Sequence, residues 1–317
     1  MNSINTNFAA ITALQALNKT NSNMVETQSR IATGFRVGGA EDNAAYWSMA
    51  TTMRADNKSL SAVSDALGLG ASTIDVAYTA MDTAIETVKD IQSKLVLARQ
   101  PGADRAKIQT EVDQLQEQLR SNATAASFAG ENWLSVDTSA AEYSATEEIV
   151  SSFARTGDSV AVGTISVDIE TTYLFNSDAA ATADARGILG SNRDATTGAI
   201  DAAGTRVLVS ADGSGEMDIS TATEADIDSF ITAVDKALKE MTDAATNLGS
   251  AKNRINLQQE FVSNLQDAID RGISTLVDAD MNEESTRMQA LQVQQQLGIQ
   301  ALSMANQNSQ NILSLFR

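Results

Sequence analysis

The chain of 317 residues contains no histidine, no cysteine and a single proline. It can therefore form no disulfide or zinc finger, and it lacks the thiolate and imidazole groups on which most familiar enzyme mechanisms depend. With 22 basic and 41 acidic residues it carries a net charge of −19. Nucleic-acid binding needs clustered lysine and arginine against phosphate, so DNA and RNA are poor partners. We predict a protein that is not an enzyme, with no metal site and no cofactor.

Long hydrophobic runs and aromatic residues are also scarce. No run of 18 apolar residues occurs, so no membrane insertion is expected. The first charged residue is Lys19, and the N-terminus therefore lacks the basic region of a cleaved secretory signal. Aromatic residues make up 4% of the chain, whereas fifty residues are alanine. This mixture favours long helices packed through small side chains over a core built on rings.

A seven-residue repeat is the strongest pattern in the sequence. Every seventh residue from Tyr46 to Leu95 is apolar, and so is every seventh residue from Ile227 to Leu276. The residues three positions after these apolar residues are mostly small, for example Ala77 after Ile74. Small side chains at these positions let two helices approach closely. Each run would form a helix about 75 Å long. We predict that the two runs pair in an antiparallel, coiled-coil-like bundle.

The middle of the chain has a different composition. The first run ends at Pro101-Gly102, where a helix should stop, and a further helical pattern follows from Ile108 to Leu119. Residues 128–226 are rich in Gly, Ser, Thr and Asp and hold 17 acidic residues against 4 arginines. Stretches rich in β-branched residues at 160–169 and 206–209 indicate strands. The predicted fold is mainly α, with a helical bundle formed by both chain ends and a loop-rich central insert containing β-strands.

Both ends of the chain are uncharged. Residues 1–18 and 288–316 carry no charged side chain, yet their apolar residues keep a helical spacing. A surface helix of an ordinary soluble domain would carry many Lys and Glu residues on its solvent face. Neutral amphipathic ends are expected to become ordered against copies of themselves. The residues predicted to make these assembly contacts are Ile4, Phe8, Ile11, Leu14, Leu17, Leu291, Leu302, Ala305, Asn306, Gln307, Ile312, Leu313 and Phe316.

Two short segments are predicted to form hinges between helices. Residues 33–39 are rich in glycine, but no strand precedes them and no Gly-Lys-Ser/Thr follows, so a hinge is favoured over a phosphate-binding loop. Residues 278–284 hold four carboxylates, which favour a helix break and an acidic cap over the acid–base pair of a hydrolase. The predicted hinge residues are Gly34, Gly38, Gly39, Asp278 and Asp280.

Four motifs stand out near the chain ends. They are Ile4-Asn-Thr-Asn7, Arg30-Ile-Ala-Thr-Gly34-Phe-Arg36-Val37, Ala40-Glu-Asp42-Asn-Ala-Ala45 and Ala305-Asn-Gln307-Asn-Ser-Gln310-Asn-Ile-Leu313-Ser-Leu-Phe316. In this order they resemble the terminal signatures of bacterial flagellins, over about the first 130 and the last 90 residues. Gly38-Gly39 replace the usual Asn-Ser, and Asn43 replaces a second Asp. We expect these departures to tune the hinge rather than to abolish assembly.

The resemblance implies a structural subunit that polymerises helically into the bacterial flagellar filament and serves swimming motility. It implies an inner filament core from residues 1–42 and 280–317, and a long-rod outer tube from residues 43–127 and 227–279. Residues 128–226 would form the variable exposed surface. It also implies secretion into an extracellular filament through the flagellar type III export apparatus. Sister flagellins, an export chaperone, and hook-associated and cap proteins would be further partners.

Two other functions fit part of the sequence. Hook–filament junction proteins have similar termini, although their C-terminal match to flagellin is usually weaker. An acidic amphipathic helical protein could bind lipid surfaces or partner helices, but the uncharged ends lack the basic face that a membrane-surface helix carries. We therefore expect a filament subunit in which Leu302→Asp blocks assembly and leaves the helix content of the monomer nearly unchanged.

Overall fold

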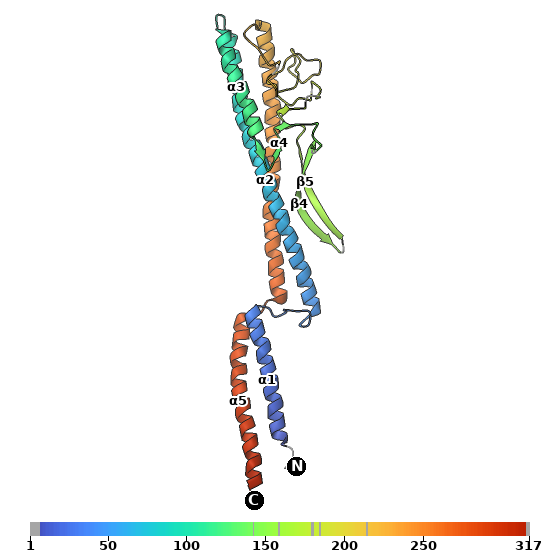
Figure 1. Ribbon diagram of the computed structural model, residues 1–317, viewed down its shortest axis with the longest axis vertical. Helices are drawn as coiled ribbons and strands as arrows, with labels where there is room; N and C mark the ends of the chain where they lie inside the picture. Colours follow the sequence, from blue (N-terminus) through green and yellow to red (C-terminus); the bar gives the residue numbers. More distant parts are fainter. Residues whose placement is uncertain are drawn as a thin grey trace. The chain divides into compact units, whose positions relative to one another are not determined.

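The computed structural model describes residues 7–314 except positions 142, 158, 179–180, 184 and 214, and it describes side chains up to residue 307. Within this range the fold is mainly helical, as predicted (Figure 1). The helices are α1 (Phe8–Thr33), α2 (Ala44–Ala98), α3 (Arg105–Ala125), α4 (Glu224–Val277) and α5 (Met281–Ser314). The strands are β1 (Ser127–Phe128), β2 (Glu131–Asn132), β3 (Ser135–Val136), β4 (Thr146–Thr156), β5 (Ser159–Asp168) and β6 (Phe175–Asn176).

Short polar side chains and one proline set the helix ends. Asn7 Oδ1 accepts a hydrogen bond from the backbone N–H of Ala10 at 3.0 Å and so caps α1. Asp280 Oδ1 accepts from the N–H of Asn282 at 2.9 Å and caps α5 in the same way. Helix α2 ends shortly before Pro101, as the sequence predicts. The acidic segment before the last helix is therefore a helix break followed by a cap.

Ser59–Asn264 forms one compact unit, in which α2 and α4 lie side by side (Figure 1). The Nζ atom of Lys252 on α4 lies 2.6 Å from Oδ1 of Asp75 on α2 and marks the register of the two helices. The heptad positions of both helices are almost fully buried, which confirms the predicted seam in this unit. These positions are Leu60, Leu67, Ile74, Met81, Val88 and Leu95 on α2, and Ile227, Val234, Met241, Leu248, Ile255 and Val262 on α4.

The residues up to Lys58, together with those from Leu265 onward, form a second unit. Its buried cluster consists of Val37, Ala50, Ile273 and Val277, with Met53, Ile269 and Leu276 packed against it. Tyr46, the first residue of the predicted repeat, is exposed. The repeat therefore begins to pack only at Met53, because Tyr46 lies in the first turn of α2, before this cluster.

Helix α3 lies along α2 and carries the next helical pattern of the sequence (Figure 1). Ile108, Val112 and Leu119 are buried, as the predicted spacing requires. Gln116 is also fully buried, and its Nε2 donates a hydrogen bond to the carbonyl oxygen of Leu208 at 2.8 Å. The insert is thus tied to α3 by a side chain on the apolar face of that helix.

The central insert contains a β-hairpin and several very short strands. Strands β4 and β5 pair antiparallel, with Ile149 opposite Ile165, and β5 confirms the strand predicted at 160–169. The strand predicted at 206–209 is wrong, because Arg206 forms only an isolated bridge with Arg193. The apolar residues at 206–209 include buried side chains that pack beneath a loop. Along the described residues, no helix is both long and apolar enough to cross a membrane.

Candidate assembly surface on the terminal helices

Helices α1 and α5 lie side by side along a seam in which small residues alternate with larger ones (Figure 1). Residues with limited exposure alternate in steps of three and four on both helices, which is heptad spacing. A Cβ atom added to Gly298 would lie 3.2 Å from Cδ1 of Leu17, so the α5 backbone approaches that side chain closely. The seam consists of Ala10, Ala13, Leu17, Thr20, Met24, Thr27 and Ile31 on α1, and Glu284, Met288, Leu291, Gln295, Gly298, Leu302 and Ala305 on α5.

Polar contacts cross this seam near both of its ends and in between. They join Asn7 Nδ2 to the carbonyl oxygen of Ala305 at 3.0 Å, Gln295 Nε2 to Asn21 Oδ1 at 2.8 Å, and Arg30 Nη1 to Glu284 Oε1 at 3.3 Å. Directional contacts of this kind specify one register of two helices more sharply than small apolar side chains do. The pairing of α1 with α5 therefore has a defined alignment within one chain.

A second set of apolar residues lies outside this seam and is exposed. We call it the terminal apolar surface, and it consists of Phe8, Ile11, Leu14 and Val25 on α1, and Val293, Leu297, Ile299 and Met304 on α5. Phe8 is 65% exposed and Leu297 is 57% exposed. Contact of these apolar side chains with water is unfavourable. Most of them lie in segments without charged side chains, so no neighbouring charge offsets this cost. Such a surface favours burial against another molecule.

The predicted assembly residues fall into these two sets. Leu17, Leu291, Leu302 and Ala305 face the seam within the chain. Phe8, Ile11, Leu14, Asn306 and Gln307 are exposed. Ile4 and Phe316 lie outside the described residues, as do the side chains of Ile312 and Leu313. Their roles in assembly remain predictions.

Five members of the terminal apolar surface were not among the residues predicted from the sequence: Val25, Val293, Leu297, Ile299 and Met304. The signal that could have found them is the helical phase. The seam residues repeat in steps of three and four, and the exposed large apolar residues lie on the remaining faces. The residues predicted from the sequence therefore include both seam residues, such as Leu302, and exposed residues, such as Phe8.

The two segments predicted as hinges are joined to each other by backbone hydrogen bonds. Gly34 adopts a left-handed conformation, with φ of 77°, and ends α1 by donating to the carbonyl oxygen of Arg30. Its own carbonyl oxygen accepts from the N–H of Ala279 at 2.9 Å. The N–H groups of Arg36 and Val37 both donate to the carbonyl oxygen of Val277, at 2.7 and 3.1 Å. The chain segments entering and leaving the terminal helices therefore form a single hydrogen-bonded joint.

Carboxylate side chains make the hydrogen bonds at the other predicted hinge residues. Asp42 Oδ2 accepts hydrogen bonds from the N–H groups of Gly38 and Gly39, at 2.9 and 3.2 Å. Asp278 Oδ2 accepts from the hydroxyl of Ser274 at 2.6 Å. Among the described residues no group of three or more acidic side chains is arranged to hold a metal ion. Asp42 and Asp278 are thus turn ligands and Asp280 is a helix cap, whereas Glu283 and Glu284 form ion pairs with arginine.

Comparison with known proteins gives matches over both ends of the chain. The bacterial flagellin N-terminal helical region matches residues 4–138, and the bacterial flagellin C-terminal helical region matches residues 231–316. Flagellin C of Rhizobium meliloti (strain 1021) is 49% identical over 326 residues, covering all of both chains. Flagellin A of the same strain is 43% identical over 396 residues, and flagellin of Brucella melitensis biotype 1 is 43% identical over 318, each also covering all of both chains.

Proposed function

Because this chain belongs to the bacterial flagellin family, it is a structural subunit of the flagellar filament, and we propose that its terminal apolar surface makes the core contacts between subunits. The observation that carries the proposal is the exposure of large apolar side chains on a helix pair whose own seam is already filled. A chain that has satisfied its internal pairing can bury these side chains only against other molecules. In a filament those molecules are further copies of the same chain.

The proposal divides the chain into three parts. Residues 1–42 with 280–317 form the inner core of the filament, and residues 43–127 with 227–279 form the outer tube. Residues 128–226 face the solvent. Support comes from charge, since the insert holds 17 acidic residues whereas 288–316 holds none. Buried contacts between subunits favour the neutral segments, and water favours the acidic one.

The proposal also includes partners beyond other copies of the chain. The subunit leaves the cell through the flagellar export apparatus with a chaperone, and its filament meets hook-associated and cap proteins at its ends. Sister flagellins co-assemble with it. Support for the last point is that flagellins named A and C of one bacterial strain both match this chain over its whole length.

Truncation of either end tests the assembly role. Purified chain is seeded or salted out and viewed by negative-stain electron microscopy, together with chains lacking residues 1–20 or 298–317. We expect filaments from the full chain, and soluble, largely helical protein without filaments from both truncations. Filaments from either truncated chain would show that the assembly contacts lie elsewhere.

A further inference from the structure

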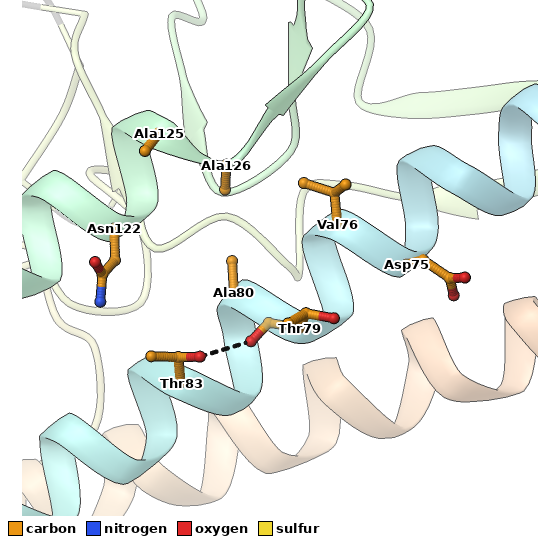
Figure 2. Close-up of a pocket in the computed structure, with 8 residues that line it drawn as sticks. All are labelled: Asp75, Val76, Thr79, Ala80, Thr83, Asn122, Ala125 and Ala126. Carbon is orange, nitrogen blue, oxygen red and sulfur yellow. Dashed lines mark hydrogen bonds between the residues drawn. The ribbon is translucent and has the colours of Figure 1, made fainter.

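A groove of about 470 Å³ lies between α2 and the C-terminal end of α3 (Figure 2). Val76 and Ala80 on α2 lie opposite Ala125 and Ala126 across this space, and Thr79, Thr83 and Asn122 add uncharged polar groups to its walls. The one charged lining residue, Asp75, points away from the space and lies 2.6 Å from Lys252 Nζ. The groove therefore suits an apolar occupant, because nothing inside it would pair a charge.

The same unit carries an apolar ridge on a different helix. Leu257 and Phe261 lie one turn apart on α4 and are 68% and 57% exposed. Their neighbours Ile255 and Val262 are almost fully buried in the seam with α2, so the ridge faces away from that seam. Two large apolar side chains adjacent on a helix surface form a protrusion that a groove of small residues can receive.

We propose that the ridge Leu257/Phe261 of one subunit fills the groove between α2 and α3 of the next subunit; this inference rests on the proposed filament function and names one of its contacts. Ridge and groove are different surfaces of the same unit, so the contact is heterologous. Each subunit offers one ridge and one groove, and addition of subunits can continue without closing. The contact therefore supports an open polymer.

The register of α2 and α4 gives the contact an axial step. Since Asp75 pairs with Lys252, Leu257 and Phe261 lie at the levels of α2 residues 70 and 66. The groove is centred near residue 79 of α2, so ridge and groove are offset along the rod by about 16 Å at 1.5 Å per residue. If the ridge of one subunit fills the groove of a parallel neighbour, the two subunits are displaced from each other along the rod axis by that amount. A lateral contact with an axial step produces a helix and not a flat ring.

Charges favour this parallel orientation. Arg254 lies on α4 one turn before Leu257, and Glu86 lies on α2 one turn beyond Thr83 at the end of the groove. Among the described residues neither has an ion-pair partner, and both are exposed. With parallel rods Arg254 is directed toward Glu86, whereas with antiparallel rods it would meet Asp75, which Lys252 already neutralises. The pair thus complements the apolar contact in one orientation only.

Because the chain has no cysteine, disulfide cross-linking tests the contact cleanly. Full-length chain with Leu257→Cys and Ala80→Cys is assembled, oxidised and dissolved in denaturant without reductant. Within one subunit the two positions lie about 15 Å apart along the rod, beyond the roughly 7 Å that a disulfide spans between Cα atoms. We expect a ladder of cross-linked oligomers from filaments and only monomer from unassembled protein. The matched control pairs Ala80→Cys with Val96→Cys, which is also exposed on α2, and should give no ladder.

The outcomes separate this inference from the filament function. Filaments that give no ladder would overturn the contact and leave the function standing, whereas failure of the unmodified chain to polymerise would overturn the function itself. A second measurement uses charge: Arg254→Glu should raise the critical concentration for polymerisation on the order of tenfold, and Glu86→Arg should restore it. Additive losses in the double variant would contradict the proposed pairing.

Discussion

Nη1 of Arg30 on α1 lies 3.3 Å from Oε1 of Glu284 on α5, in the last turn of one helix and the first turn of the other. The Glu284 side chain is only 6% exposed, and among the described residues its Oε2 atom has no hydrogen-bond partner. Arg287 contacts the same Oε1 atom at 3.2 Å. A buried carboxylate so placed makes the pairing of α1 with α5 sensitive to the loss of either arginine.

Removal of Arg30 is expected to loosen the terminal helices. Arg30→Ala should lower the free energy of unfolding of the α1–α5 pair by about 1–3 kcal/mol, because Glu284 then keeps one partner in place of two. Hydrogen exchange of the α1 and α5 amides measures this change. Arg30 also pairs with Glu26, which is more than half exposed, so Glu26→Ala should change stability by at most about 0.5 kcal/mol. Equal effects of both variants would assign the stabilisation to the surface pair.

The two faces of α5 predict different results for two leucines. Leu302 faces the seam, so Leu302→Asp should disturb the pairing with α1 in the monomer as well as assembly. This prediction replaces the sequence-based expectation of an unchanged monomer. Leu297 is exposed, so Leu297→Asp should block filaments and leave the circular dichroism of the monomer unchanged. Normal filaments from Leu297→Asp, seen by electron microscopy, would remove this residue from the assembly contacts.

Gly70 is expected to be essential for the docking of β4 on α2. An added Cβ would lie 2.7 Å from both Cδ1 and Cγ2 of Ile149, whose β-branched side chain is stiff. Gly70→Ala should therefore lower the thermal stability despite the better helix propensity of alanine, with a net loss of about 1–2 kcal/mol. Gly249 in α4 is the matched control, since its added Cβ would meet only Tyr78 Cε2 at 3.7 Å. Gly249→Ala should raise the stability, and a similar gain at Gly70 would disprove the close approach.

The helical rods could be predicted from the sequence because their signal is local and repeated. Leu67, Ile74 and Met81 lie seven residues apart, and each repeat reports the same buried face. The faces of the terminal helices could not be separated so easily. Leu297 and Leu302 are the same residue type in one helix, and their helical phase separates them only once the face that meets α1 is known.

The insert could be predicted only in outline, because its contacts join residues far apart in the sequence. Gln116 on α3 hydrogen-bonds the carbonyl oxygen of Leu208, and Arg193 lies 2.6 Å from Glu240 on α4. Such pairings leave no periodic pattern. The β-branched run at 206–209 therefore indicated a strand, although its apolar side chains serve the packing of a loop.

Arg193 is expected to hold the insert on α4 without contributing to assembly. It is fully buried, and its guanidinium donates to the carbonyl oxygens of Gly198 and Ile188 and to Glu240. Arg193→Ala should lower the free energy of local opening by about 3 kcal/mol, seen as faster proteolysis within 185–210, while filaments still form. The exposed Arg186 is the control, and Arg186→Ala should change neither the rate of proteolysis nor filament formation. Loss of filaments from Arg193→Ala would make the insert a polymer contact.

The ion pair beyond the end of α2 predicts a pH dependence of stability. Arg99 Nε lies 2.6 Å from Asp228 Oδ1, and hydrogen bonding to this guanidinium lowers the pKa of Asp228 below its usual 3.8. A carboxyl with a lowered pKa stabilises the fold above the usual value, and this contribution is lost as the pH falls through the lowered one. Asp228→Asn should therefore melt at a lower temperature than the parent chain at neutral pH, with a difference that shrinks below pH 3.8. Thermal melts across that pH range measure the difference in melting temperature.

Asp243→Asn is the control, because Asp243 is exposed on the same helix and has no ion-pair partner among the described residues. A melting difference for Asp228→Asn that stays constant as the pH falls would show that the carboxylate charge does not stabilise this end of the bundle.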